Sequence, residues 1–189
     1  MAKPTVLLYP GAGSDSDHSS LVAIDGRFGS RGYVERRDFA YRREGRKAPD
    51  RATKLMATIR EDLGGFSRRR GPVVMGGRSM GGRMTTMVAA NVDERGPVDR
   101  LAGLVLISYP LHPPGKPENL RVDHLPDVDV PCLFVSGTRD PFFTPDELET
   151  WTATIGAPVR HVWVDGGRHD LKGADDLIAE HVRRFVADL

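Results

Sequence analysis

The sequence predicts an α/β fold, a three-layer αβα sandwich with about six mostly parallel strands. Six short apolar runs alternate along the chain with segments of helical pattern, which is typical of a parallel sheet covered by helices on both faces. The chain has 189 residues, of which 39% are hydrophobic and 28% charged. This is an ordinary globular composition and length, so we expect residues 1–189 to form a single domain.

The apolar runs define the expected strands. Each run is short and is bounded by glycine, proline or polar residues, as buried strands are. The expected strands are Thr5–Tyr9, Tyr33–Tyr41, Pro72–Met75, Leu104–Ile107, Pro131–Val135 and Val159–Val164. The second of them is polar enough to lie at an edge of the sheet.

Helical patterns fill most of the intervals between these runs. We expect helices at Ser19–Gly29, Asp50–Leu63, Met80–Asn91, from Thr144 onward, and at Ala174–Ala187. Asp50 is a plausible N-cap for the second helix, and Thr144 and Glu147 have the spacing of a capping box. The longest irregular stretch, Ser108–Asp129, is rich in proline, and it could fold over a site at the sheet edge.

Charge and apolar content limit the expected partners and location. The formal net charge is +1, and arginine clusters such as Arg36-Arg37, Arg42-Arg43 and Arg68-Arg69-Arg70 are expected to be solvated surface rather than a nucleic-acid patch. No apolar run approaches the roughly 20 residues that span a bilayer, and no signal peptide precedes the first strand. We therefore expect a cytoplasmic protein with no nucleic-acid or membrane partner. The single cysteine, Cys132, is expected to be buried and inert.

One serine lies between a strand pattern and a helix pattern, with glycines on both sides. The stretch Gly77-Arg78-Ser79-Met80-Gly81 fits G-x-S-x-G, which predicts a nucleophile elbow in this context. Taken alone, this motif is a weak signal because turns between small residues are common.

An aspartate and a histidine follow at the ends of later strands. The carboxyl ends of parallel strands meet at one edge of the sheet, so we expect Ser79, Asp140 and His169 to converge there. Histidine would take the serine proton, and the aspartate would orient the imidazole and stabilise its charged form. Asp140 could instead be a turn residue, His112 is the rival base, and Asp165 and Asp170 are the rival acids.

The same edge supplies candidates for binding the reacting group. Two backbone amides, of Met80 and Ala12, are expected to form an oxyanion hole. The candidate substrate-binding residues are Gly11, Gly13, Arg78, Tyr109, His112 and Phe142. Arg78 could meet an anionic substrate group or point into solvent. No H-x-x-H or H-E-x-x-H pair is present, so we expect no metal ion, and nothing in the sequence indicates a cofactor.

Three motifs together resemble a small branch of the α/β-hydrolase superfamily that is related to dienelactone hydrolases. They span residues 77–83 (GRSMGGR), 109–116 (YPLHPPGK) and 137–142 (GTRDPF). The sequence also resembles the hydrolase-like domain of a subunit of a nonspecific-lethal histone acetyltransferase complex. The resemblance implies a minimal α/β-hydrolase sheet with no lid domain, and the triad Ser79, Asp140 and His169.

The sequence differs from the resembled families at two places, and these differences limit the reactions that we expect. Many hydrolases carry His-Gly after the first strand, whereas this chain has Pro10-Gly11. Dienelactone hydrolases use a cysteine nucleophile, whereas position 79 is serine, which argues against that particular reaction.

The residues favour a serine hydrolase that acts on a carboxylic ester or thioester, with a small-molecule acyl substrate. The alternative is a non-catalytic binding or scaffold protein that retains the hydrolase fold. Peptidase action would use the same triad, although no specificity pocket for it is recognisable. The sequence leaves the oligomeric state open between monomer and homodimer.

Overall fold

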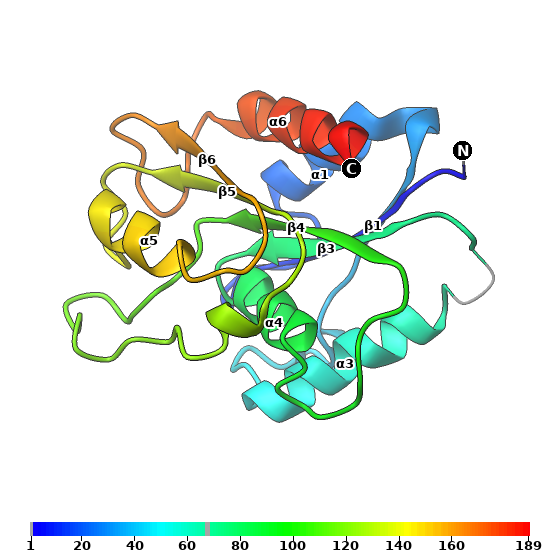
Figure 1. Ribbon diagram of the computed structural model, residues 1–189, viewed down its shortest axis with the longest axis horizontal. Helices are drawn as coiled ribbons and strands as arrows, with labels where there is room; N and C mark the ends of the chain where they lie inside the picture. Colours follow the sequence, from blue (N-terminus) through cyan, green and yellow to red (C-terminus); the bar gives the residue numbers. More distant parts are fainter. Residues whose placement is uncertain (1, 67–68) are drawn as a thin grey trace.

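One parallel sheet of six strands forms the centre of the computed structural model, which describes residues 2–66 and 69–189 (Figure 1). The strands lie in the spatial order β2-β1-β3-β4-β5-β6, and every neighbouring pair is parallel. Their bounds are β1 Thr5–Tyr9, β2 Tyr33–Arg36, β3 Val73–Arg78, β4 Leu101–Ile107, β5 Cys132–Gly137 and β6 Val159–Val164.

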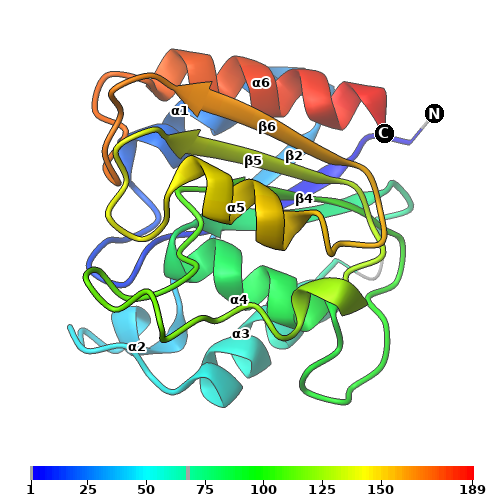
Figure 2. The ribbon, with the colours of Figure 1, turned by 60° about the vertical axis from the view of Figure 1, so that its left-hand side comes forward.

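Helices cover both faces of this sheet, as predicted. The α-helices are α1 Ser19–Phe28, α2 Ala40–Arg43, α3 Ala52–Gly64, α4 Met80–Ala89, α5 Pro145–Thr152 and α6 Asp175–Asp188, with 3₁₀ turns at Gly29–Arg31 and Leu125–Asp127. Figure 2 shows α1 and α6 on one face and α3, α4 and α5 on the other. The α/β-hydrolase fold predicted from the sequence is confirmed, and the described ranges contain no separate lid domain.

Side-chain alternation along the strands divides the core into two layers. In β1, Leu7 packs in the cluster under α3, α4 and α5, whereas Val6 packs in the cluster under α1 and α6. Both side chains are fully buried, because a parallel sheet with helices on each face leaves neither side to solvent. The predicted burial of Cys132 is confirmed, and that burial raises the pKa of its thiol to about 12.

The strand order reverses between β1 and β3, and this reversal places the candidate site. From β1 the chain first moves outward to β2 and then returns to the other side of β1 as β3. In open α/β sheets, ligands bind beyond the carboxyl ends of the strands at such a switch point. Here those two strand ends carry Gly11–Gly13 and Ser79.

The second strand is shorter than the sequence predicted. It ends at Arg36, whereas the expected strand continued to Tyr41. Beyond the strand the chain turns toward the core and buries Phe39 and Tyr41 completely, and the Phe39 ring stacks on Tyr9 at 4.8 Å. The edge position predicted for this strand is confirmed.

The expected cap at Asp50 is also wrong. Helix α3 begins at Ala52, its N-cap is Arg51, and no side chain caps it. The Asp50 carboxylate instead accepts from Arg46 and lies 3.3 Å from the Lys54 ammonium nitrogen. The capping box of α5 is confirmed, since Thr144 Oγ1 accepts from the Glu147 amide at 3.3 Å and the Glu147 carboxylate accepts from the Thr144 amide.

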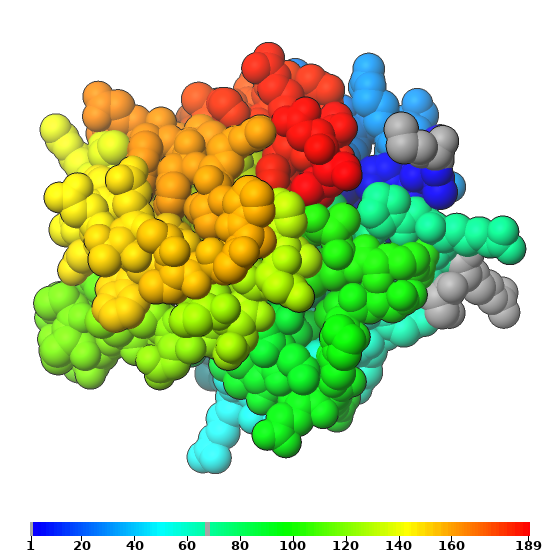
Figure 3. All heavy atoms as spheres, viewed as in Figure 1, coloured from blue at the N-terminus to red at the C-terminus, as the bar shows by residue number. Residues whose placement is uncertain are grey.

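The proline-rich segment 108–129 is ordered against the α4 side of the sheet. Its apolar side chains Tyr109, Leu111, Val122 and Leu125 are buried in the α3–α5 core layer. In Figure 3 the segment forms part of the closed surface at the lower left, beside the yellow side chains of α5. Much of this irregular segment is therefore packed against the core, and two of its residues, Pro110 and Arg121, line the cavity described below.

The arginine clusters are largely paired with acidic neighbours. Arg36 bonds to Asp17 and Asp25, and Arg69 lies 2.6 Å from Glu35; Arg68 lies outside the described residues. Over the ranges that the structure describes, none of the helices combines the length and apolar character needed to cross a bilayer.

Candidate active site

Ser79 occupies a strained turn between β3 and α4. Its backbone has φ 46° and ψ −116°, a region that a non-glycine residue occupies only under constraint. The glycines of the motif allow close approach to β1: a Cβ at Gly77 would lie 2.1 Å from the Tyr9 carbonyl oxygen, and one at Gly81 would lie 2.4 Å from it. The turn thus presents the serine at the switch point, as a nucleophile elbow does.

The three side chains predicted to converge form a chain of hydrogen bonds. His169 Nδ1 lies 2.8 Å from Asp140 Oδ2, and His169 Nε2 lies 2.9 Å from Ser79 Oγ. A carboxylate can only accept, so Nδ1 carries a proton, and in the neutral imidazole Nε2 is then the acceptor for the serine hydroxyl. This is the arrangement in which histidine can take the Ser79 proton.

The Asp140 and His169 side chains are held by their own surroundings. The Asp140 side chain has no exposed surface, whereas 25% of the His169 side chain is exposed. The second carboxylate oxygen, Oδ1, accepts from the Phe142 amide at 3.0 Å. The Phe142 ring in turn stacks on the imidazole, with centroids 4.1 Å apart. The imidazole is therefore held by its hydrogen bonds to Asp140 and Ser79 and by one stacked face, and a quarter of the side chain remains exposed.

Arg78 is buried beneath the histidine loop, so neither role considered for it from the sequence describes it. Its residue exposure is 5%, it does not line the cavity, and its Nη2 donates to the His169 carbonyl oxygen at 2.8 Å. Burial lowers the pKa of this guanidinium below its ordinary value. Arg78, the residue directly before Ser79, is thus bonded to the backbone of His169.

The two predicted oxyanion donors lie beside the serine. Met80 is the first residue of α4, so its amide has no partner within the helix. In the part of the chain that the structure describes, neither the Met80 nor the Ala12 amide donates to a protein backbone acceptor. The Tyr41 hydroxyl donates to the Ala12 carbonyl oxygen at 3.0 Å, which holds the Ala12–Gly13 peptide directly after that amide.

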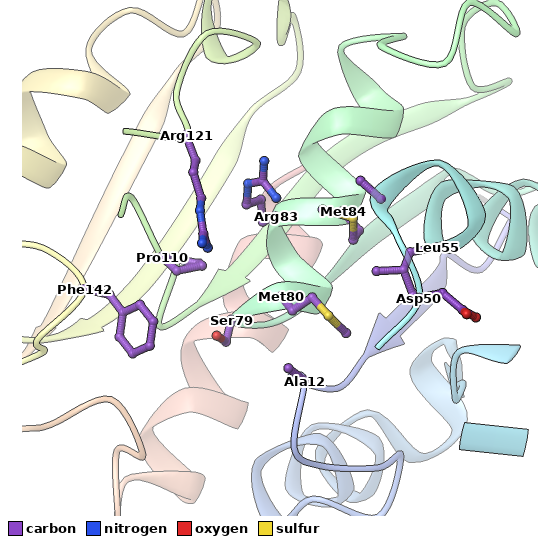
Figure 4. Close-up of a pocket in the computed structure, with 11 residues that line it drawn as sticks. Ala12, Asp50, Leu55, Ser79, Met80, Arg83, Met84, Pro110, Arg121 and Phe142 are labelled. Carbon is purple, nitrogen blue, oxygen red and sulfur yellow. The ribbon is translucent and has the colours of Figure 1, made fainter. Parts of the chain in front are cut away.

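A cavity of about 380 Å³ opens at Ser79. Its lining consists of Ala12, Asp50, Ala52, Leu55, Ser79, Met80, Arg83, Met84, Pro110, Arg121 and Phe142. Figure 4 shows Arg121, Pro110 and Phe142 on one side of Ser79, and Leu55 and Asp50 on the other. Of the predicted substrate-binding residues, only Phe142 belongs to this lining.

Four other predicted substrate-binding residues are not among those that line the cavity. Tyr109 is fully buried, and its hydroxyl lies 3.0 Å from Thr86 Oγ1, so it is a core residue. His112 is 5% exposed, and its Nδ1 donates to the Pro113 carbonyl oxygen; the imidazole that lies at Ser79 Oγ is that of His169, not that of the rival His112. Gly11 and Gly13 lie in the loop after β1 but do not line the cavity.

Sequence reasoning missed the cavity walls contributed by α3, by α4 and by segment 108–129. The most consequential omissions are Arg83, which lies one helical turn after Ser79, and Arg121. The spacing of four residues from Ser79 to Arg83 was an available signal, because residues four apart share a helix face. No local pattern marked Arg121, because its position depends on how the irregular segment folds.

The family of this chain is shown by a match that spans most of its length. Residues 2–182 match the model of a family described as "Alpha/beta hydrolase domain". The chain belongs to the α/β-hydrolase family, as the three sequence motifs indicated.

Solved structures of hydrolases share the fold over nearly the whole chain. A metagenome-derived lipolytic enzyme is 19% identical with a TM-score of 0.76, and the match covers 100% of this chain and 95% of that one. Est1E from Butyrivibrio proteoclasticus is 18% identical with a TM-score of 0.76, covering 99% and 88%. A dienelactone hydrolase from Anabaena variabilis is 18% identical with a TM-score of 0.77, covering 99% and 87%. At such identities the likeness concerns the fold, and the substrate has to be argued from the site.

Proposed function

We propose that this protein is a serine hydrolase that cleaves a carboxylic ester or thioester through an acyl-enzyme intermediate on Ser79. The observation that carries the proposal is the hydrogen-bonded chain from Ser79 through His169 to Asp140, with bonds of 2.9 and 2.8 Å. Membership of the α/β-hydrolase family supports the same reaction class.

The chemistry divides into two steps. In the first, His169 Nε2 takes the hydroxyl proton while Ser79 Oγ bonds to the acyl carbon, and the bond to the leaving group breaks as His169 returns the proton to it. In the second, a water molecule gives one proton to His169 Nε2 while its oxygen bonds to the acyl carbon, and the bond from the acyl carbon to Ser79 Oγ then breaks as His169 returns the proton to Oγ, which releases the acid. In both steps the Met80 and Ala12 amides would donate to the oxyanion, and losing one such donor typically lowers the rate by about 10²–10³.

The cavity supports a small acyl substrate. Its volume of about 380 Å³ lies at the lower end of the roughly 300–1,000 Å³ of typical ligand sites. Apolar side chains of Leu55, Met80 and Met84 supply one wall. A cavity of this size accommodates a short acyl chain better than the acyl chain of a long lipid.

The test is labelling of the pure protein with a fluorophosphonate probe, which reacts with activated serines. We expect the wild-type protein to label, and Ser79→Ala and His169→Ala to lose the label. Ser30→Ala is the matched control, because Ser30 is exposed in the 3₁₀ turn after α1. Butyryl esters, thioesters and amides of one leaving-group series would then define the bond that is cleaved.

The absence of labelling in a folded wild-type protein would reject this proposal. It would favour the alternative of a binding or scaffold protein that retains the fold. Labelling that persists in Ser79→Ala would instead show that another side chain is the nucleophile.

A further inference from the structure

Two guanidinium groups line the candidate active-site cavity without an acidic partner. Arg83 lies on α4 one turn after Ser79, and Arg121 extends from segment 108–129. Figure 4 shows Arg121 reaching toward Pro110 and Ser79, with Arg83 beside it. Among the described residues, neither side chain takes part in an ion pair or a side-chain hydrogen bond, and Arg83 Nε is buried with no partner.

This lack of pairing distinguishes Arg83 and Arg121 from many other arginines of the protein. Arg60, for example, is held by the Asp93 carboxylate at 2.8 Å. The one carboxylate in the cavity lining, Asp50, lies across the cavity and is engaged by Arg46 and Lys54.

The electrostatic surroundings of Arg83 are unfavourable to its charge. Burial lowers the pKa of the Arg83 guanidinium below its ordinary value, and repulsion from Arg121 adds to that lowering. A half-buried cation beside a second cation is stabilised when an anion binds both, because charge-assisted hydrogen bonds replace lost solvation. An anion in the cavity would therefore stabilise both guanidinium groups.

We propose that Arg83 and Arg121 form a subsite for an anionic oxygen group, a carboxylate or a phosphate, carried by the substrate next to the bond that Ser79 attacks. The use of this subsite in turnover rests on the proposed function, whereas binding of the anion does not. The substrate would then carry a charge on the arginine side of Ser79 and apolar atoms on the side of Leu55 and Met84.

The catalytic experiment compares two esters of similar acyl length, mono-4-nitrophenyl glutarate and 4-nitrophenyl valerate. We expect wild-type kcat/KM to be higher for the glutarate ester. The glutarate-to-valerate ratio should fall at least tenfold in Arg83→Gln and in Arg121→Gln, the size expected for a lost charge-assisted hydrogen bond. Arg95→Gln is the matched control, because Arg95 is exposed and outside this cavity. Equal ratios in all four proteins would overturn the subsite.

A binding experiment separates failure of the subsite from failure of catalysis. Glutarate and inorganic phosphate are titrated against Ser79→Ala alone and with Arg83→Gln or Arg121→Gln added, by isothermal calorimetry. Binding that weakens tenfold or more on loss of either arginine supports the subsite even if no ester is cleaved, and the tighter ligand distinguishes carboxylate from phosphate. No binding of either anion to folded Ser79→Ala would refute the subsite, whatever the labelling result. Arg121→Gln changes a side chain on the surface segment, so it keeps the test open if Arg83→Gln fails to fold.

Discussion

Adding one methyl group at Gly81 should disturb the candidate active site, because the methyl group would clash with the backbone at the end of β1. In Gly81→Ala the new Cβ would lie 2.4 Å from the Tyr9 carbonyl oxygen and 2.7 Å from that of Pro10, both of them backbone atoms. Real Cβ atoms essentially never approach other atoms closer than 3.0 Å. Because the interior is close-packed, either β1 or the elbow must shift by roughly 0.6 Å or more.

That shift separates the two backbone segments that carry the proposed oxyanion donors. Tyr9 and Pro10 lead into the loop of Ala12, whereas Gly81 follows Met80 on α4. A misplacement near 1 Å can lower a rate by about 10²-fold, so we expect kcat/KM to fall roughly 10- to 100-fold. Overpacking typically destabilises by about 1–3 kcal/mol, so the free energy of unfolding should decrease by that amount.

Two measurements and one control test this reasoning. The rate of fluorophosphonate labelling reports the site, and urea unfolding reports stability. Gly26→Ala is the control, because Gly26 is exposed in α1 and a Cβ there meets nothing within 4 Å. If Gly81→Ala labels as fast as the wild type and Gly26→Ala do, the close approach of β1 to the elbow does not matter to the site.

Three further predictions concern single residues. Asp140→Asn should lower kcat by about 10⁴-fold with little change in fold, since an amide donor facing His169 Nδ1 favours the tautomer that cannot accept from the serine; a loss under tenfold in ester hydrolysis would contradict this role. Thr144→Ala should reduce the free energy of unfolding by about 1 kcal/mol through loss of the α5 cap, measured by urea unfolding against exposed Thr150→Ala. Burial lowers the pKa of His124 to about 4, so the unfolded chain, with a histidine pKa of about 6.5, takes up the proton first as pH falls. The free energy of unfolding should therefore decrease by about 3 kcal/mol from neutral pH to pH 4, and an equally steep pH dependence in His124→Gln would assign the effect to other groups.

Much of the sheet could be predicted because strand signals here are local. A buried parallel strand needs a continuous apolar run, and five of the six runs became strands within a few residues of their expected ends. The exception, 33–41, failed because Phe39 and Tyr41 look like strand residues in sequence. They are buried by a turn into the core instead, where the Phe39 ring stacks on Tyr9, and a contact between residues so far apart in the chain leaves no local pattern.

The convergence of Ser79, Asp140 and His169 could be predicted for a topological reason, whereas the residues that line the cavity could not. Ser79, Asp140 and His169 each follow a strand, and parallel topology brings such positions to one edge whatever the loops do. Arg121 lies in a segment without regular structure, so its place beside Arg83 depends on long-range packing. Arg78 was predicted to face the substrate or solvent, but an arginine at the end of a buried strand can also fold inward under a neighbouring loop, as it does here.

The internal arrangement of the site bears on the choice between catalysis and scaffolding. The Ser79 backbone is held in a conformation that costs about 1–3 kcal/mol. Arg78 is buried, and its Nη2 donates to the His169 carbonyl oxygen, while its Nη1 has no hydrogen-bond partner among the described residues. A surface that only binds a partner gains nothing from a strained serine or from a base fixed at 2.9 Å from its hydroxyl. Such constraints are instead useful where one geometry must be ready before the substrate arrives. If Ser79→Gly, which relieves the backbone strain, raises the free energy of unfolding while abolishing fluorophosphonate labelling, the strain serves the chemistry. If that substitution leaves stability unchanged or lowers it, the elbow geometry is simply part of the fold, and this reason to prefer catalysis disappears.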